Sequence, residues 1–467
     1  MPATMLTAST GLMALRERLA AWEASDRAQA ASRNVLVTLT APAPEFEPLA
    51  VFEQTAGLER LYWRSPGGAI EIAGVGLETL PERRGVSPSD RWLDLTKDAR
   101  AAPANPGPIS FAGAAFDPER TSDGAWEGWP RRAAFVPRLV AVQRGDERFL
   151  QLQILPGAAG AASWDLVRLL DRLDARLDAD QACVGAGAPA TAAILRTMEE
   201  PAPPRWRELA RDTVGAIAAG EVGKLVLARC QQVEAARPFD LHAALRRLRS
   251  RYGDCTVFAI DRGAGCFIGA TPELLVTQRE GIVRTTAVAG SAPRAADPAR
   301  DAALSAELLT DAKEQHEHAL VVRALEDGLR PLCSELHADS APSLLRLANV
   351  QHLYTEIKGA LGVPATALDV ALRLHPTPAV GGVPREGAQR LLRRAEPFDR
   401  GWFGGPLGWM DARGDGEFVV AIRSALVNGT RARLYAGCGI VAGSEPAREY
   451  EESRLKMQSM RWALGCP

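Results

Sequence analysis

An arginine within an apolar segment is the first residue of this sequence whose type suggests chemistry. Arg423 shares one face of a predicted strand with Val419, Ala421, Ala425 and Val427. A buried charge is costly unless it is paired, and a guanidinium can grip a carboxylate through two parallel hydrogen bonds. Arg423 is therefore a candidate for binding an anionic ligand, although a core carboxylate or main-chain carbonyl groups would satisfy it equally well.

A glutamate on the inward side of a predicted helix is the second candidate. Residues 299–329 form one long predicted helix, on which Glu317 lies on the same stripe as Leu320, Val321 and Ala324. A carboxylate in that position needs a cation. The cation is either a metal ion or the ammonium group of Lys313, one turn away on the same helix.

Three charged residues share one face of the last predicted helix, residues 447–462. Glu449, Glu452 and Lys456 follow the spacing i, i+3 and i+7, which by itself is typical of a solvated surface. The preceding glycine-containing loop, residues 437–443, would let the backbone approach a ligand closely. Its spacing is not that of a dinucleotide fingerprint, and no Walker A sequence occurs, so we exclude a nucleotide site.

Glutamates on two distant helices favour a hard metal ion. No pair of cysteine or histidine ligands lies near them in the sequence, so Mg²⁺ with several retained waters is the natural candidate. His316 and His318 are two positions apart on a helix and point to different faces, which argues against zinc. We expect both histidines on the helix surface.

The elements that position these residues are those of a mixed α+β protein. The pattern predicts a short apolar strand at 224–229, a hairpin between 255 and 269, and a strand at 417–427 that is buried on both faces. Lys224 starts the first strand and Glu273 follows the hairpin at a bend, where pattern alone favours a structural role for each. Strands and helices alternate without a regular βαβ rhythm, which favours an α+β core.

The composition limits the partners of the protein. Among 467 residues, 55 basic and 57 acidic side chains nearly cancel, so no overall field attracts nucleic acid or a membrane surface. No run of about 18 apolar residues and no signal peptide is recognisable. The seven cysteines show no CxxC spacing, which fits free thiols in a reducing compartment. We expect a cytoplasmic protein that captures a small anion with local charges.

Seven sequence blocks, in order, resemble those of the chorismate-utilising enzymes. This family includes isochorismate synthase, salicylate synthase, anthranilate synthase component I and aminodeoxychorismate synthase component I. The resemblance covers about residues 206–460, and seven ordered blocks are far more specific than any one of them. The blocks are KLVLAR (224–229), FIGATPELLV (267–276), TTAVAGSAPR (285–294), LLTDAKEQHEHALVV (308–322), LHPTPAVGGVPRE (374–386), GEFVVAIRSALV (416–427) and YAGCGIVAGSEPAREYEESRLK (435–456).

The resemblance implies a fold like that of anthranilate synthase component I. This α+β fold has two large antiparallel sheets packed face to face, with flanking helices and an active-site cleft between the layers. Residues 1–467 would form one such unit. Residues 1–200 would supply its N-terminal sheet-and-helix portion, and residues 205–460 the family core that carries the active site.

The resemblance also implies catalytic roles. Lys224 would be the general base that activates water, and Glu273 the general acid that protonates a departing hydroxyl. Glu317 and Glu452 would bind Mg²⁺, with Glu449 nearby through water. The residues expected to contact the substrate are Gly290, Ser291, His375, Ala379, Arg423, Gly437, Gly439 and Lys456.

Two positions distinguish the branches of the family. Lys224 stands where anthranilate synthase typically has glutamine, because ammonia needs no such base. Ala289 stands where aminodeoxychorismate synthase has the lysine of its PIKGT motif. The resemblance therefore implies a water-using isomerase that converts chorismate to isochorismate, as a monomer and without a glutamine amidotransferase subunit.

Two alternatives stay open beside this isomerase. Salicylate synthase also adds water and then eliminates pyruvate, but the segment at 375–382 looks more like that of isochorismate synthases. A chorismate-binding protein without catalytic activity is an alternative of another class.

Overall fold

The computed structural model describes residues 10–25, 37–80, 107–122, 124–154, 167–171, 173–174, 192–347 and 350–466. Within these ranges every strand pairing is antiparallel. The strands are β1 (Val37–Pro42), β2 (Arg60–Arg64), β3 (Ile70–Thr79), β4 (Ile109–Ala114), β5 (Arg132–Arg144), β6 (Glu147–Ile154), β7 (Ile194–Glu200), β8 (Lys224–Ala235), β9 (Thr256–Asp261), β10 (Cys266–Thr271), β11 (Leu274–Arg279), β12 (Ile282–Pro293), β13 (Cys333–Ala338), β14 (Ser343–Arg346), β15 (Val350–Leu361), β16 (Gly382–Val383), β17 (Pro406–Asp411), β18 (Gly416–Val420), β19 (Ser424–Asn428) and β20 (Arg431–Ile440).

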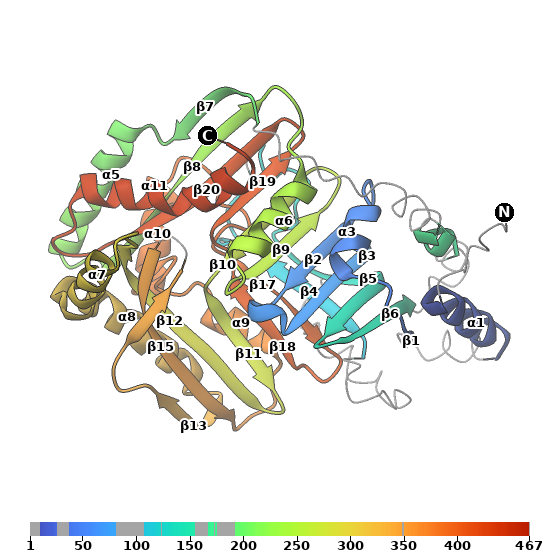
Figure 1. Ribbon diagram of the computed structural model, residues 1–467. Coiled ribbons are helices and arrows are strands. Elements are labelled where there is room, and N and C mark those ends of the chain that lie inside the picture. Colours follow the sequence, from blue (N-terminus) through green and yellow to red (C-terminus); the bar gives the residue numbers. More distant parts are fainter. Residues whose placement is uncertain are drawn as a thin grey trace.

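The strands form two layers that are joined through the long strand β5. The first layer runs β7–β8–β20–β19–β10–β9–β2–β3–β5–β6–β1, with the short β16 also paired to β8. The second layer runs β5–β4–β17–β18–β11–β12–β15, and β13 and β14 both pair with β15. Strands from the N-terminal part of the chain pair with strands that come much later in the sequence, as in the β2–β9 and β4–β17 pairs (Figure 1). Both parts of the chain therefore contribute to the same pair of layers.

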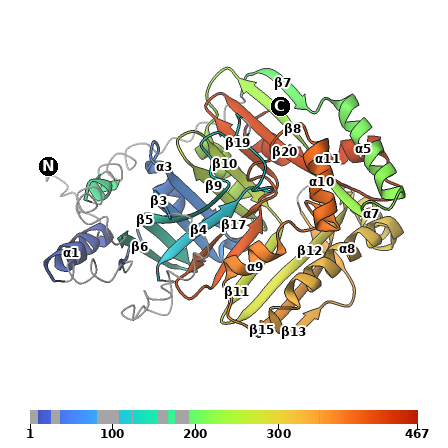
Figure 2. The ribbon, with the colours of Figure 1, turned by 180° about the vertical axis from the view of Figure 1, so that it is seen from behind.

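Helices cover the outer faces of both layers, as Figures 1 and 2 show from opposite sides. Helices α1, α3, α5, α6, α10 and α11 pack on strands of the first layer, and α7, α8 and α9 pack on the second. Their bounds are α1 (Thr10–Ser25), α3 (Pro48–Gln54), α5 (Pro203–Ala218), α6 (Leu241–Arg251), α7 (Pro298–Thr310), α8 (Ala312–Leu329), α9 (Ala367–Leu374), α10 (Arg385–Ala395) and α11 (Pro446–Ala463).

The side-chain alternation of the strands builds separate cores on the two faces of each layer. On β9, Phe258 and Ile260 belong to a core of strand and loop residues between the layers, whereas Val257 and Ala259 pack toward the helices. This period-2 division is expected for a strand covered on both faces. The expected α+β fold with two face-to-face antiparallel layers is thus confirmed.

Two predicted elements are interrupted. The helix predicted at 299–329 is two helices, because Asp311 ends α7 and its side chain caps α8 by accepting a hydrogen bond from the Glu314 N–H. The strand predicted at 417–427 is likewise two strands, β18 and β19. They are separated at residues 421–423, where Arg423 has a φ of 51°. The prediction of Arg423 on one continuous strand face is therefore wrong.

The glycine loop predicted at 437–443 starts later than expected. Gly437 and Gly439 lie within β20, where they pair with Ala228 and Val226 of β8. Of the seven cysteines, the six within the described ranges are free, as expected, and Cys183 lies outside those ranges. No helix in the described ranges has the length and apolar character needed to cross a membrane.

Gly113 of β4 lies so close to Trp402 that a substitution there can test the packing between the layers. A Cβ placed on Gly113 of β4 would lie 2.3 Å from Cζ3 of Trp402, a buried core residue. We predict that Gly113→Ala lowers the free energy of unfolding by about 1–3 kcal/mol through overpacking, as measured by denaturant titration.

The matched control for this variant is Gly215→Ala in α5, where a Cβ would meet no atom within 4 Å. Alanine is the better helix former there, so the control should gain about 0.5–1 kcal/mol. If the two variants proved equally stable, the packing of Trp402 against β4 would be refuted.

Candidate active site

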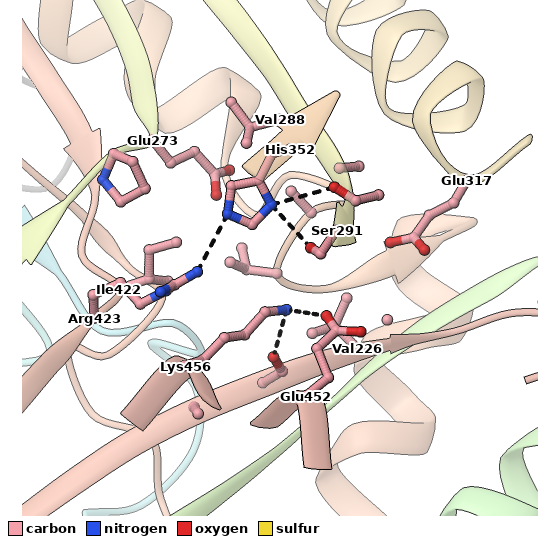
Figure 3. Close-up of a pocket in the computed structure, with 18 of the residues that line it drawn as sticks. Val226, Glu273, Val288, Ser291, Glu317, His352, Ile422, Arg423, Glu452 and Lys456 are labelled. Atoms are coloured by element: carbon pink, nitrogen blue, oxygen red, sulfur yellow. Dashed lines mark hydrogen bonds and ion pairs between the residues drawn. The ribbon is translucent and has the colours of Figure 1, made fainter. Parts of the chain in front are cut away.

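A buried cavity lies between the two layers, and charged side chains converge on it from both (Figure 3). Strands β8 and β20 form one wall, β12 and β15 form the opposite wall, and α8 and α11 contribute carboxylates. Its polar and glycine lining comprises Lys224, Glu273, Gly290, Ser291, Glu314, Glu317, His352, Arg400, Arg423, Tyr435, Gly437, Gly439, Glu452 and Lys456. The cleft expected between the sheets is therefore present.

An ion pair joins the first layer to α8. Lys224 is the first residue of β8, its side chain is 1% exposed, and its Nζ lies 2.9 Å from Glu317 Oε1. Glycine at position 439 makes room for this pair, because a Cβ there would lie 2.5 Å from the same oxygen. Glu317 therefore pairs with Lys224 and not with Lys313, the partner considered from the sequence.

Glu273 is a buried carboxyl group between β10 and β11. Burial raises its pKa to about 7, although the nearby charges of Lys224, Lys456 and Arg423 oppose this shift. Thr377 donates a hydrogen bond of 3.5 Å to its Oε1. No cation lies within ion-pair distance of Glu273 among the described residues, so it can hold a proton near neutral pH, as a general acid must.

A histidine holds the guanidinium of Arg423 in the cavity. Arg423 Nη2 lies 3.3 Å from His352 Nε2, and His352 Nδ1 lies 3.2 Å from the Gly290 carbonyl oxygen and 2.9 Å from Ser291 Oγ (Figure 3). Because a guanidinium only donates, Nε2 must accept, and Nδ1 carries the proton. Burial and the charge of Arg423 accordingly hold the pKa of His352 well below its usual value.

The second group of charges lies between α8 and α11. Lys456 Nζ is 2.7 Å from Glu452 Oε1 and donates to the Gly437 carbonyl oxygen at 3.2 Å. Lys313 bridges two carboxylates, at 3.1 Å from Glu314 and 3.0 Å from Glu449. All three of these glutamates, 314, 449 and 452, line a second cavity that adjoins the first along α11.

The donor set of this region suits a divalent cation. Ligand atoms of Glu449, Glu452 and Cys438 lie within 4.8 Å of one another, and Glu317 faces the cavity that Glu452 also lines. Oxygen donors of this kind are the ones that Mg²⁺ prefers. The presence of a cysteine in this group was not expected from the sequence, because Cys438 lies 11 residues before Glu449 and without a CxxC partner.

The structure brings most of the predicted site residues together. Eleven of the thirteen, Ala379 among them, line the cavity between the layers, and Glu449 lines the adjoining one. His375 does not line either: its Nε2 bonds the Phe116 carbonyl oxygen at 3.0 Å, and it borders a separate cavity. His318 is buried and bonds Thr355 Oγ1 at 2.7 Å, so its predicted surface position is wrong, whereas His316 is exposed.

Several residues of the site were not predicted from the sequence. No recognisable signal marks His352, which lies outside the seven blocks, whereas Thr377 and Lys313 lie within the blocks 374–386 and 308–322 but were not assigned to the site. Glu314 could have been found, because it is one turn before Glu317 and faces the same way. The others meet the site only because β15, the segment after α9, and α11 are neighbours in the folded chain.

Comparison with known proteins gives one family for almost the whole chain. Residues 22–465 match the model of a family described as chorismate binding enzyme. The salicylate biosynthesis isochorismate synthase of Pseudomonas aeruginosa is 37% identical over 458 residues, covering 94% of this chain and 92% of that protein.

Two solved structures share the fold. The menaquinone-specific isochorismate synthase of Escherichia coli is 27% identical, with a TM-score of 0.77 over 92% of this chain and 94% of that one. Anthranilate synthase component I of Streptococcus pneumoniae, at 21% identity, has a TM-score of 0.65 over 91% and 92% of the two chains. The latter likeness concerns the fold alone.

Buried neutral histidines predict a loss of stability in acid. Burial lowers the pKa of His318 and His375 to about 4, and that of His352 well below its usual value. Below about pH 6.5 the unfolded chain binds protons that the folded chain does not, so the free energy of unfolding should fall as the pH falls.

Nuclear magnetic resonance can check this directly. The ring resonances of these three histidines, assigned with His→Gln variants, should not titrate between pH 8 and pH 5.5. A midpoint near 6.5 for His352 would contradict its role as acceptor for Arg423.

Proposed function

The chain belongs to the family of chorismate binding enzymes, and we propose that it is an isochorismate synthase, an isomerase that moves the hydroxyl group of chorismate. The observation that carries this proposal is the cavity into which Lys224 and Glu273 both project, from different elements of the fold. One is a base candidate and the other is an acid whose burial raises its pKa to about 7. The 37% identity to an isochorismate synthase over 94% of the chain supports the same activity.

The proposed reaction needs one proton acceptor and one proton donor. Lys224 acts as the base in its neutral form, so its ammonium group first releases a proton to solvent. Water then attacks C2 of the ring, and the proton of that water passes to the free amine of Lys224. The double bonds shift, and the C4 hydroxyl leaves as water after it takes a proton from Glu273. Atoms balance, because one water enters and one leaves, and the product is an isomer of the substrate. Thr377, which donates to Glu273 Oε1, keeps that carboxyl group oriented.

The cations of the cavity fit a substrate with two carboxylates. Arg423 is buried, and among the described residues no carboxylate lies within ion-pair distance of it. Lys456 lies on the same side of the cavity (Figure 3). We assign the substrate carboxylates to these two cations and to main-chain amides of Gly290, Gly437 and Gly439, which line the cavity without side chains in the way.

Mg²⁺ is the proposed cofactor. Glu317, Glu449 and Glu452 would hold it, and bound Mg²⁺ would supply positive charge that neutralises a substrate carboxylate and draws electrons from the conjugated ring. The ion pair of Lys224 with Glu317 involves one of these ligands, so the ammonium group and the metal compete for the same carboxylate.

The described residues that line the cavity do not include those that would favour the sister reactions of the family. Ala289, which lines it, offers no amine for a covalent intermediate. Lys224 supplies a base that an ammonia-using enzyme does not need. The proposed reaction therefore uses water and needs no amidotransferase subunit. We propose the cytoplasm as its location. Isochorismate is the starting compound for menaquinone, catecholate siderophores and salicylate.

The origin of the product oxygen tests the proposed reaction. Turnover of chorismate with Mg²⁺ in H₂¹⁸O should give isochorismate that is heavier by one ¹⁸O atom, as seen by mass spectrometry. Appearance of salicylate with pyruvate would replace the proposal with salicylate synthase. Calorimetric binding of chorismate without any turnover would indicate a protein that only binds it.

Two substitutions test the base. Lys224→Ala should lower kcat by about 10²–10⁴-fold, the usual contribution of a general base. Lys224→Arg keeps a cation beside Glu317, but a guanidinium does not release its proton. Its kcat should therefore be as low as that of Lys224→Ala, while the fold stays stable. Lys358→Ala, on the exposed side of β15, is the matched control and should be fully active. Substantial turnover by Lys224→Arg would rule out this base.

The pH dependence tests the acid. Glu273 acts only when protonated, so kcat should fall as the pH rises through its pKa of about 7. Glu273→Gln should lose turnover, whereas Glu335→Gln, an exposed residue of β13, should not. Since the folded protein holds a proton that the unfolded chain releases above about pH 4.5, Glu273→Gln should also unfold less readily than the parent at pH 8. A kcat that keeps rising to pH 9 would contradict the assignment.

A further inference from the structure

A thiol lies among the carboxylates of the proposed metal site. The side chain of Cys438 is fully buried, and its Sγ lies 2.9 Å from Glu449 Oε2, to which the thiol donates a hydrogen bond. Ligand atoms of Cys438, Glu449 and Glu452 all lie within 4.8 Å of one another. In the described ranges, no other cysteine belongs to such a group of three ligand residues.

The topology directs this thiol toward the metal ligands. Gly437 and Gly439, the neighbours of Cys438 on β20, line the cavity between the layers. Successive side chains of a strand point to opposite faces, so Cys438 points away from that cavity and toward α11, where Glu449 lies. A metal ion bound by the two α11 glutamates would therefore have a sulfur atom as its neighbour.

The spacing of the three ligand atoms suits a small tetrahedral ion. Zinc–sulfur bonds of about 2.3 Å and zinc–oxygen bonds of about 2.0–2.2 Å place neighbouring ligand atoms roughly 3.5 Å apart. The hydrogen-bonded sulfur and oxygen, now 2.9 Å apart, would separate slightly, and the second glutamate would complete three ligands. A water molecule or a substrate oxygen would supply the fourth.

We propose that Cys438, Glu449 and Glu452 form a site for a thiophilic divalent cation such as Zn²⁺, which binds there more tightly than Mg²⁺. Sulfur ligands favour zinc, whereas Mg²⁺ gains little from them. The ion forms a bond to sulfur, and the thiol proton is released to solvent. The further consequence, inhibition of turnover by zinc, rests on the proposed function.

The charges around the site fit this occupant. A thiolate and two carboxylates carry three negative charges, and Zn²⁺ neutralises two of them. Lys456, at 2.7 Å from Glu452, can balance the one remaining negative charge. Lys313, at 3.0 Å from Glu449, is itself balanced by Glu314 at 3.1 Å. The bound ion would thus not leave an uncompensated buried charge, which would be costly.

Spectroscopic titration tests the site without reference to activity. The full-length, metal-free protein is titrated with Co²⁺ and with Cd²⁺, whose bonds to thiolate give ultraviolet charge-transfer absorption. We expect a band that saturates at one equivalent, is abolished in Cys438→Ser and is retained in Cys333→Ser, a control at a half-buried cysteine outside the cluster. Calorimetry should show at least a tenfold weaker Zn²⁺ affinity for Cys438→Ser and less than a twofold change for Mg²⁺.

A second variant distinguishes the loss of a metal ligand from the loss of the fold. Glu449→Gln keeps the shape of a carboxylate ligand but removes its charge, and should also weaken Zn²⁺ binding at least tenfold, with circular dichroism confirming the fold of both variants. A thiolate band of equal strength in Cys438→Ser, or no band in the parent protein, would overturn the site.

Inhibition separates this inference from the proposed function. In the presence of Mg²⁺, the zinc concentration that halves the activity should rise at least tenfold in Cys438→Ser, each variant being compared with its own uninhibited rate. An unchanged zinc concentration would overturn the inhibitory role. A thiolate band in a protein that does not turn over chorismate would support the metal site and refute the proposed function alone.

Discussion

The balance of buried charge around the cavity between the layers is the constraint on which the rest of this structure depends. Each buried ammonium group of the cavity has a carboxylate partner: Lys224 has Glu317, and Lys456 has Glu452. Neither Glu273 nor Arg423 has a group of opposite charge within ion-pair distance among the described residues. Glu273 avoids the cost of a buried charge by holding a proton, and Arg423 is held by the neutral His352. Glu273 can thus exchange a proton, and Arg423 can bind an anion, without first breaking an ion pair, whereas Lys224 and Lys456 each have a carboxylate beside them.

The two-layer architecture supplies these groups from opposite sides. Lys224 comes from β8 of the first layer, and His352 comes from β15 of the second. No single layer contains both the base candidate and the residue that holds Arg423. Residues of α8 and α11 close the arrangement, so the site exists only when helices and both layers are packed together.

Interruptions in a helix and in a strand position charged side chains at the cavity. Asp311 ends one helix and starts the next, so that the first two turns of α8 carry Glu314 and Glu317 to the cavity. The break between β18 and β19 gives Arg423 a left-handed backbone conformation, from which its side chain reaches His352. Such a conformation is unfavourable for a residue with a Cβ and persists only where surrounding contacts enforce it. Sequence periodicity extends across both breaks and predicts neither.

The sequence by itself determined the α+β class, the family and most of the polar and glycine residues that line the cavity, because ordered blocks of motif residues and apolar periodicity are local properties of the chain. Lys224, Glu273, Glu317 and Glu452 were all predicted, and all face one cavity. Only the tertiary structure decided which groups pair. In the folded protein Glu317 pairs with Lys224, and Cys438 lies beside Glu449. His375 lies outside the cavity, and His318 is buried. The physical reason is that pairing depends on distances between strands and helices far apart in the chain, which spacing along the sequence does not contain.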